Sequence, residues 1–175
     1  ILIKHHCRLT FKHVFEYIKL NIPPNQYCIL SNNDIYFDTS IQHLAKINFN
    51  NTLVTLLRYN IENYNGQFSL YCENNAPCIY SQDTWIVKTP LNIIPPDINF
   101  HLCIKGCDNR LLYQFYISGY NIYNYALEIK SYHLHLSNIR TYKFNQSIIK
   151  PHLWIKPIHI YNRTNFRNFI KLVFR

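Results

Sequence analysis

Carboxylates are scarce in this chain. Nine Asp and Glu residues stand against 18 Lys and Arg residues over 175 positions, and the formal net charge is +9. The few positions that carry a carboxylate are therefore informative. A basic surface suits a phosphate-bearing partner, either a nucleic acid or a nucleotide-linked substrate. The basic residues are spread along the whole chain, so net charge alone does not decide between these two partners.

Three other features are missing. No apolar run approaches the roughly 20 residues that a membrane-spanning helix needs, so no transmembrane segment is expected. No pair among the six cysteines has the two-residue gap of a zinc knuckle. No secretory signal is visible in the sequence. We therefore expect reduced, mostly structural cysteines and a cytoplasmic protein.

The order of secondary-structure patterns predicts one α/β domain. The length fits a single domain, and a hydrophobic content of 48% is enough for a substantial core. Helices are expected at 8–20, at 109–118 and near 165–174, and a further short helix can be capped by Asp38, Thr39 or Ser40. Strands are expected at 27–30, 52–59, 84–88 and 120–123, and 126–136 looks extended. Asp108 is the predicted N-cap of the helix at 109–118, and Gly119 is its predicted stop.

The segment from Tyr27 to Asp38, YCILSNNDIYFD, is the most informative one. Its apolar beginning predicts a buried strand, and Asn32, Asn33 and Asp34 follow at the C-terminal end. Ligands and metals gather at this end of the strands in α/β sheets. Mg²⁺ and Mn²⁺ prefer oxygen ligands, so Asp34, with Asn32 facing the same site, is a candidate for metal binding. The alternative is an Asx-rich turn, in which these side chains bond their own backbone.

A second polar group, from Gly106 to Arg110, leads into a predicted helix. Free N–H groups at the helix start stabilise the anion of Asp108, so capping is the structural interpretation. In the functional interpretation, Asp108 is a general base that removes a proton from an attacking hydroxyl. Arg110 then steers phosphate or holds a carboxylate, or else it is a solvated surface side chain.

Two further short motifs carry candidate residues. His133 and His135 alternate on an extended segment, so both imidazoles face one side and can contribute to a metal site, although two histidines alone cannot fix a metal. In the motif SQDTW, Trp85 can stack on a sugar or a base while Asp83 bonds hydroxyls. The structural alternatives are polar residues near a strand end and a core tryptophan beside a solvated carboxylate.

The order of the motifs SNNDIYFD, SQDTW, GCDNR and HLH resembles the second half of a GT-A-type glycosyltransferase, a family of nucleotide-sugar-dependent enzymes. In that family a strand ends in Asp-x-Asp, an acidic residue later opens a helix, and a histidine near the following strand can complete the metal site. The resemblance covers residues 8–142. It implies an α/β fold with a Rossmann-like mixed sheet flanked by helices. Residues 1–142 would be the C-terminal part of the catalytic domain, and 143–175 a basic, aromatic extension packed on the same domain.

The resemblance also implies an activity. A sugar would pass from a nucleotide-sugar donor to a hydroxyl of a glycan, protein or small-molecule acceptor, with the help of Mn²⁺ or Mg²⁺. Asp34 and His135 would hold the cation, and Asp108 would be the catalytic base. The residues that would bind donor or acceptor are Asn32, Asp83, Trp85, Arg110 and His133.

The chain departs from the family pattern in three places. Asn32 stands at the first position of Asp-x-Asp, and Asn109 stands where many relatives have a second acidic residue. Only a strand candidate at 1–3 and one helix precede the Asn32 loop, whereas the family builds its nucleotide pocket from its first two or three β/α units. These departures leave three alternatives: an N-terminally truncated fragment, an upstream part that supplies the missing units, or an inactive chain.

Two other classes of function stay open. With 15 Tyr, 11 Phe and 2 Trp beside its basic residues, the chain has the composition of a module that stacks bases and contacts phosphates. No RNP-like or helix-turn-helix pattern is present, however, so no nucleic-acid partner is expected. The second class is a catalytically inactive glycosyltransferase-like interaction domain. The sequence indicates no oligomeric state.

Overall fold

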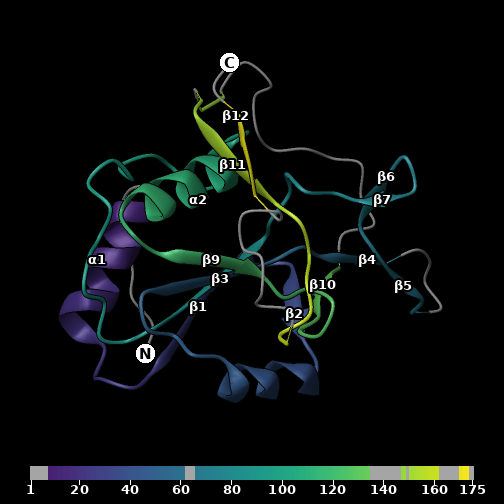
Figure 1. Cartoon of the computed structure of the whole chain (residues 1–175), viewed down its shortest axis with the longest axis horizontal. Helices are drawn as coiled ribbons and strands as arrows, with labels where there is room; N and C mark the ends of the chain where they lie inside the picture. The colour runs from purple at the N-terminus through teal and green to yellow at the C-terminus, as the bar shows by residue number, and fades with distance from the viewer. Residues whose placement is uncertain (1–7, 62–65, 135–146, 149, 162–169, 174–175) are drawn as a thin grey trace.

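The structure, a computed structural model, describes residues 8–61, 66–134, 147–148, 150–161 and 170–173. Figure 1 shows the helices and strands, with the 3-10 helix labelled η1 in the text. In chain order they are α1 (Phe11–Asn21), β1 (Tyr27–Ser31), β2 (Ile35–Phe37), η1 (Thr39–Lys46), β3 (Thr52–Leu56), β4 (Tyr59–Ile61), β5 (Phe68–Leu70), β6 (Cys72–Glu73), β7 (Ala76–Pro77), β8 (Thr84–Lys88), α2 (Cys107–Ile117), β9 (Asn121–Asn124), β10 (Ser131–His133), β11 (His152–Ile155) and β12 (Ile170–Val173).

A four-stranded mixed sheet, in the order β1-β8-β3-β9, lies at the centre. β8 runs antiparallel to both of its neighbours, whereas β3 and β9 are parallel. Every residue of β3 is buried, because strands flank it on both sides and other layers cover both faces of the sheet. The mixed sheet with helices packed on it confirms the predicted α/β class.

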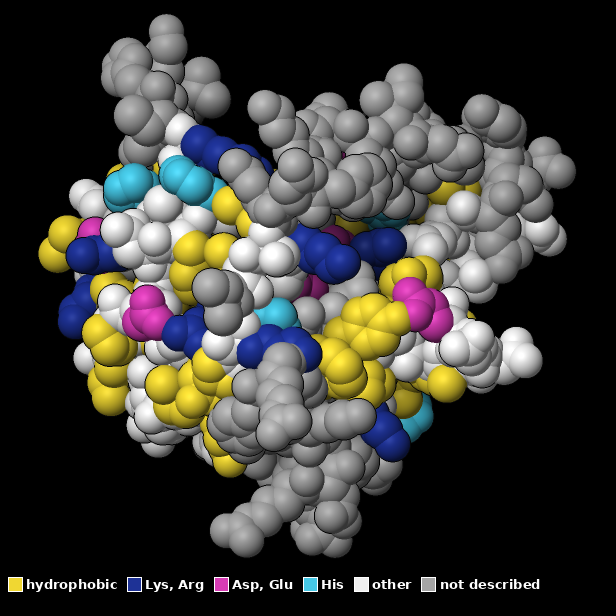
Figure 2. Space-filling model, turned by 90° about the horizontal axis from the view of Figure 1, so that it is seen from above, with side chains coloured by type: hydrophobic (Ala, Val, Ile, Leu, Met, Phe, Trp, Pro, Cys, Tyr) yellow, Lys and Arg dark blue, Asp and Glu magenta, His cyan; other side chains and the backbone are white. Residues whose placement is uncertain are grey.

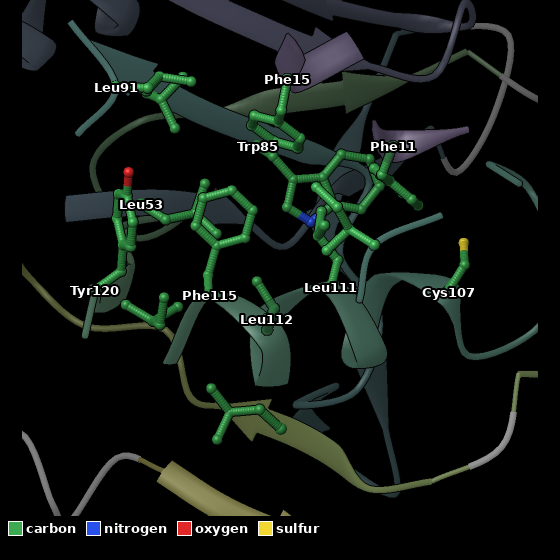
Figure 3. Close-up of a cluster of buried hydrophobic side chains, with 14 of the residues drawn as sticks. Phe11, Phe15, Leu53, Trp85, Leu91, Cys107, Leu111, Leu112, Phe115 and Tyr120 are labelled. Carbon is green, nitrogen blue, oxygen red and sulfur yellow. The ribbon is translucent and has the colours of Figure 1, made fainter. Parts of the chain in front are cut away.

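The helices α1 and α2 cover one face of this sheet. Alternate residues of a strand point to opposite faces, so Leu53 of β3 and Trp85 of β8 face the helices. Figure 3 shows Phe11 and Phe15 of α1 and Phe115 of α2 close to these two residues. The Phe11 and Trp85 rings meet edge to face, with centroids 5.3 Å apart. The apolar stripe that predicted α1 is therefore the stripe that the helix buries.

The opposite face carries a second apolar layer. Val54 of β3 and Ile86 of β8 are fully buried there, against Leu44 of η1. Ile158 and Ile160, from the segment after β11, belong to the same cluster. The predicted cap of η1 is confirmed, because the Asp38 carboxylate accepts a hydrogen bond from the N–H of Ser40.

A second sheet, in the order β2-β10-β4-β5, begins where the first one ends. β2 follows β1 after three residues, and β4 follows β3 after two, so both short strands continue beyond the same end of the central sheet. In Figure 1 this is the right-hand end, where α2 also begins. The loops that follow β1 and β3 therefore connect the first sheet to the second and lie between them.

Several sequence-based predictions need correction. Among the described residues β1 pairs only with β8, and Tyr27 and Ile29 are 40% and 41% exposed, so β1 is an edge strand rather than a buried one. The N-cap of α2 is Gly106, at φ +83°, and Asp108 lies inside the first turn. The expected extended segment at 126–136 contains only the short strand β10 within its described part.

The expected final helix is also wrong in its described part. Residues 170–173 form β12, which pairs with β11 in an antiparallel ladder. This pairing joins segments far apart in the sequence, and local periodicity carries no information about it. None of the helices in the described residues is long and apolar enough to cross a membrane.

Candidate functional site

Polar residues lie at the ends of three neighbouring strands of the central sheet. Thr84, the first residue of β8, pairs with Ser31 at the end of β1 and with Leu56 at the end of β3. The residues that follow β1 and β3 and precede β8 therefore meet at one end of the sheet. The start of α2 and the short strand β10 contribute to the same region. We call the following six residues the polar cluster: Asn32, Asp34, Arg58, Asp83, Asp108 and His133.

Asp83 is the most tightly held member of the polar cluster. Its Oδ2 lies 2.6 Å from Arg58 Nη1, and its Oδ1 accepts a hydrogen bond of 2.8 Å from Asn32 Nδ2. The residue is only 8% exposed, so this ion pair is largely removed from water. Both carboxylate oxygens thus have partners within the protein. The structure places Asp83 and Asn32 against each other, and the Asn32 amide is turned to Asp83.

Arg58 connects the loops around the cluster. Besides Asp83, its guanidinium donates to Ser81 Oγ at 3.1 Å and to Asn60 Oδ1 at 2.8 Å. The guanidinium also lies over the ring of Tyr71, 4.4 Å from the centroid. Sequence reasoning missed this residue. The signal was available, because Arg58 is the first charged residue after the apolar run of β3 and, like Asn32, lies within two residues of the end of its strand.

Asp34 pairs with His133. The distance from Asp34 Oδ2 to His133 Nε2 is 3.0 Å, and the N–H of Leu134 donates to the carbonyl of Asp34 at 2.9 Å. Burial and the nearby Arg58 guanidinium lower the pKa of His133 below its ordinary value, and Asp34 only partly offsets this. The neutral imidazole is the form that binds metal ions.

Asp108 is a carboxylate with a strongly perturbed pKa. Gln82 N–H donates to its Oδ2 and Asn109 Nδ2 to its Oδ1, both at 3.2 Å. Burial and, to a lesser extent, the charge of Asp83 raise the pKa of Asp108 to about 7, although hydrogen bonds from backbone N–H groups oppose the shift. At neutral pH the carboxyl group is thus close to half protonated, which suits a group that accepts and returns a proton.

Two buried amide oxygens, in residues that hydrogen-bond to Asp108, have no hydrogen-bond partner among the described residues. They are Oε1 of Gln82 and Oδ1 of Asn109. The residues are 2% and 5% exposed. A buried acceptor without a donor costs about 1–3 kcal/mol, so such oxygens in a native structure need an explanation. A ligand hydroxyl that donates to one of them would remove this cost.

A divalent cation has few ligands in the polar cluster. Within the described residues, no group of three or more His, Cys, Asp and Glu side chains is placed to hold a metal ion. Asp34 supplies one carboxylate, and the neutral imidazole of His133 is paired with it at 3.0 Å. Mg²⁺ commonly uses one or two carboxylates plus the phosphate oxygens of a substrate. The described donors therefore fit a cation that arrives with phosphates, and they do not form a cage of protein ligands alone.

The remaining predicted site residues lie elsewhere. Trp85 is a core residue, 4% exposed and packed on Phe11, so its ring is not on the surface of the cluster (Figure 3). Arg110 forms an ion pair with Asp97 and lies over the ring of Tyr113. His135 lies outside the described residues.

Comparison with family models, with curated proteins and with solved structures finds no match for this chain. Its function must therefore be argued from the polar cluster and from the surface. Figure 2 shows Lys and Arg side chains scattered over one face among hydrophobic and other residues, not gathered in one band. Tyr125 and Phe115 are fully buried, whereas Tyr27, Tyr36, Tyr80 and Tyr161 are each at least 37% exposed.

Proposed function

We propose that the chain is a metal-assisted glycosyltransferase domain that transfers a sugar from a nucleotide-sugar donor to an acceptor hydroxyl. The observation that carries this proposal is the position of Asp108, a carboxyl group with a pKa of about 7, near Asp83 in the cluster that also holds the Asp34–His133 pair. A candidate general base, Asp108, and a candidate site for the donor phosphates, the Asp34–His133 pair, then lie at one end of a mixed sheet. A GT-A-like arrangement of that sheet is part of the proposal.

Asp108 acts as the general base in this mechanism. Its carboxylate takes the proton of the acceptor hydroxyl while the acceptor oxygen forms a bond to the anomeric carbon of the donor sugar. The bond from that carbon to the diphosphate oxygen breaks, and the nucleoside diphosphate leaves with the electron pair. Proton transfer by a positioned side chain contributes typically about 10²–10⁴-fold to a rate. Direct displacement of this kind inverts the configuration at the anomeric carbon.

The buried amide oxygens position the acceptor. Gln82 Oε1 and Asn109 Oδ1 each lack a donor among the described residues, and both residues hydrogen-bond to Asp108. A sugar or other polyol offers several hydroxyl groups. One hydroxyl can donate to Asp108 while a neighbouring one donates to an amide oxygen. This double contact fixes the orientation of the reacting oxygen.

The donor diphosphate binds on the Asp34 side of the cluster. Asp34 and His135, together with the phosphate oxygens, would hold a cation such as Mn²⁺ or Mg²⁺. The cation would supply Lewis-acid stabilisation of the leaving diphosphate. The neutral His133 keeps the Asp34 carboxylate oriented through their 3.0 Å contact. Arg58 and Asp83 act as positioning residues, because their ion pair fixes the loops after β1 and β3. We place this activity in the cytoplasm. The reducing conditions there would keep the five cysteines that are free in the structure as thiols, namely Cys28, Cys72, Cys78, Cys103 and Cys107.

The proposal is tested by the release of nucleoside diphosphate from a panel of nucleotide sugars. The assay compares Mn²⁺, Mg²⁺ and a chelator, with and without acceptor hydroxyl compounds. We expect turnover with one donor and a metal, and a loss of at least 100-fold in Asp108→Ala. Asp34→Ala should raise the metal concentration needed for half-maximal activity.

Glu16→Ala is the matched control for a lost carboxylate, because Glu16 lies on the exposed side of α1, where it pairs with Lys12. This variant should keep the wild-type rate. Activity that survives both Asp34→Ala and Asp108→Ala would contradict the assignment. Failure of the folded protein to bind any nucleotide sugar would indicate an inactive interaction domain instead.

A further inference from the structure

A cavity of about 340 Å³ opens at the opposite end of the central sheet. The turn before β3, the segment after β8 and the turn before β9 form its walls. In Figure 1 this is the left-hand end of β3 and β9, whereas the polar cluster lies at their right-hand end. The volume falls within the range of about 300–1,000 Å³ that is usual for small-molecule sites. None of the proposed catalytic residues lines this cavity.

The lining combines carboxamides with apolar groups. Four asparagines contribute to it, namely Asn48, Asn50, Asn51 and Asn92. A carboxamide has both donor and acceptor groups, as each hydroxyl of a sugar does. Asn92 Nδ2 and Asn51 Oδ1 bond each other and Asn48 Oδ1 accepts from the N–H of Asn50, which leaves, in the described part of the chain, the amide groups of Asn50 and the second groups of the other three for a ligand. Phe49 and Leu91 supply apolar surface to the same cavity. A sugar ring presents hydroxyls at its edge and C–H groups on its faces, so it matches both kinds of lining.

The charges of the lining narrow the ligand class. Among the lining residues there is no carboxylate, and Lys88 carries the one formal charge. Its ammonium lies over the ring of Tyr27, 5.1 Å from the centroid. A cationic ligand would meet no counter-charge here and would face Lys88. The lining therefore suits a neutral hydroxylated ligand, and it tolerates one that carries a phosphate.

Hydrogen bonds hold the walls in place before any ligand binds. Asn92 Nδ2 donates to Asn51 Oδ1 at 3.0 Å, which joins the segment after β8 to the turn before β3. The N–H of Asn121 donates to the carbonyl of Asn51 at 2.8 Å, which joins that turn to β9. Tyr120 Oη donates to the carbonyl of Ile93 at 2.7 Å. A site whose walls are already joined loses little conformational entropy on binding.

From these observations we infer a second binding site, separate from the polar cluster, that takes a neutral monosaccharide unit in the asparagine-lined cavity. The ligand is either a free sugar or the terminal residue of a glycan. The inference rests on the lining and stands whether or not the polar cluster is catalytic. A free monosaccharide should bind with a dissociation constant on the order of 1 mM, since it buries few atoms.

The test is saturation-transfer difference NMR with the purified chain and a panel of neutral hexoses and N-acetylhexosamines. Glucose 6-phosphate and inorganic phosphate form two further arms. We expect at least one neutral sugar to bind. Asn92→Leu and Asn50→Leu should each weaken its affinity at least tenfold, because each removes a carboxamide from the lining. Asn99→Leu, at an exposed asparagine outside the cavity, should not change it.

Four outcomes would overturn the inference. The first is the absence of binding by every neutral sugar up to tens of millimolar. The second is binding that Asn92→Leu and Asn50→Leu leave unchanged while circular dichroism shows both variants folded. The third is equal binding of glucose 6-phosphate and inorganic phosphate without any neutral sugar, because Lys88 alone would then explain the result. Binding that disappears in Asp34→Asn would place the sugar in the polar cluster and would also refute this site.

Discussion

Replacement of Asp108 by Asn should stabilise the protein at neutral and alkaline pH. Burial raises the pKa of this group from 3.8 to about 7. A tenfold change in an ionisation constant corresponds to about 1.4 kcal/mol. The folded state thus opposes ionisation of Asp108 by about 4 kcal/mol. This value is an upper bound, because Asp108 is only partly buried as a residue and water screens part of the effect.

The sign of the pH dependence follows from linkage. Between pH 3.8 and about 7 the folded state binds more protons at Asp108 than the unfolded state does. The free energy of unfolding therefore falls as the pH rises through this window, and the full penalty is present above it. An Asn at this position has no proton to lose. Its Oδ1 can still accept a hydrogen bond from the N–H of Gln82.

The measurement is urea denaturation of wild type and Asp108→Asn at pH 5 and at pH 8. We expect the variant to gain up to about 2–3 kcal/mol on the wild type between these two pH values. The difference between the two proteins is the informative quantity, because His133 and His152 have lowered pKa values and contribute the opposite slope to both. A difference that stays constant, or a variant that becomes less stable at pH 8, would refute the buried carboxylate.

Three further predictions concern the cluster and the core. Arg58→Met should reduce the free energy of unfolding by roughly 3–5 kcal/mol, because it leaves the buried Asp83 without its cation. The double variant Arg58→Met/Asp83→Asn should recover part of this loss. Equal stability of the single and the double variant would show that the ion pair contributes little. Phe115→Ala should reduce the free energy of unfolding, measured by urea denaturation, by roughly 3–5 kcal/mol, since the ring is fully buried. Tyr161 is 72% exposed, so Tyr161→Ala should change stability by less than about 0.5 kcal/mol. Similar costs at both positions would contradict the described core. Mn²⁺ alone should leave the melting temperature of the wild type unchanged. Mn²⁺ together with a nucleoside diphosphate should raise the melting temperature of the wild type but not that of Asp34→Ala. A large increase with Mn²⁺ alone would indicate a resident metal site instead.

Much of the fold can be predicted from local patterns. The stripe of Phe11, Phe15 and Ile18 predicts α1, and the same three residues are buried in the structure. The strand at 84–88 and the capped helix after Asp38 are also local features, and both are found where the sequence places them. In each case the signal lies within one helix or one strand, so no distant contact is needed to interpret it.

The position of the candidate residues depends on long-range pairing, which the sequence does not contain. Local patterns predict Asp34 and Asp108 as candidates, because one follows a strand and the other opens a helix, and the structure brings both to one end of the central sheet. The sequence gives no indication that Asn32 would turn to Asp83, or that Arg58 would join them. Trp85 shows the same limit. Its neighbours in SQDTW are polar, yet its place in β8 directs the indole into the core.

The central claim is that Asp108 is the base of a metal-assisted sugar transfer, and a pH profile of nucleoside diphosphate release tests it most directly. With a nucleotide-sugar donor, Mn²⁺ and acceptor present, the rate of the wild-type protein should be half-maximal near pH 7 and fall tenfold per pH unit below it. Asp108→Asn should remove both the activity and this profile while the protein stays folded. A rate that is independent of pH from 5 to 8, or that persists in Asp108→Asn, would contradict the claim.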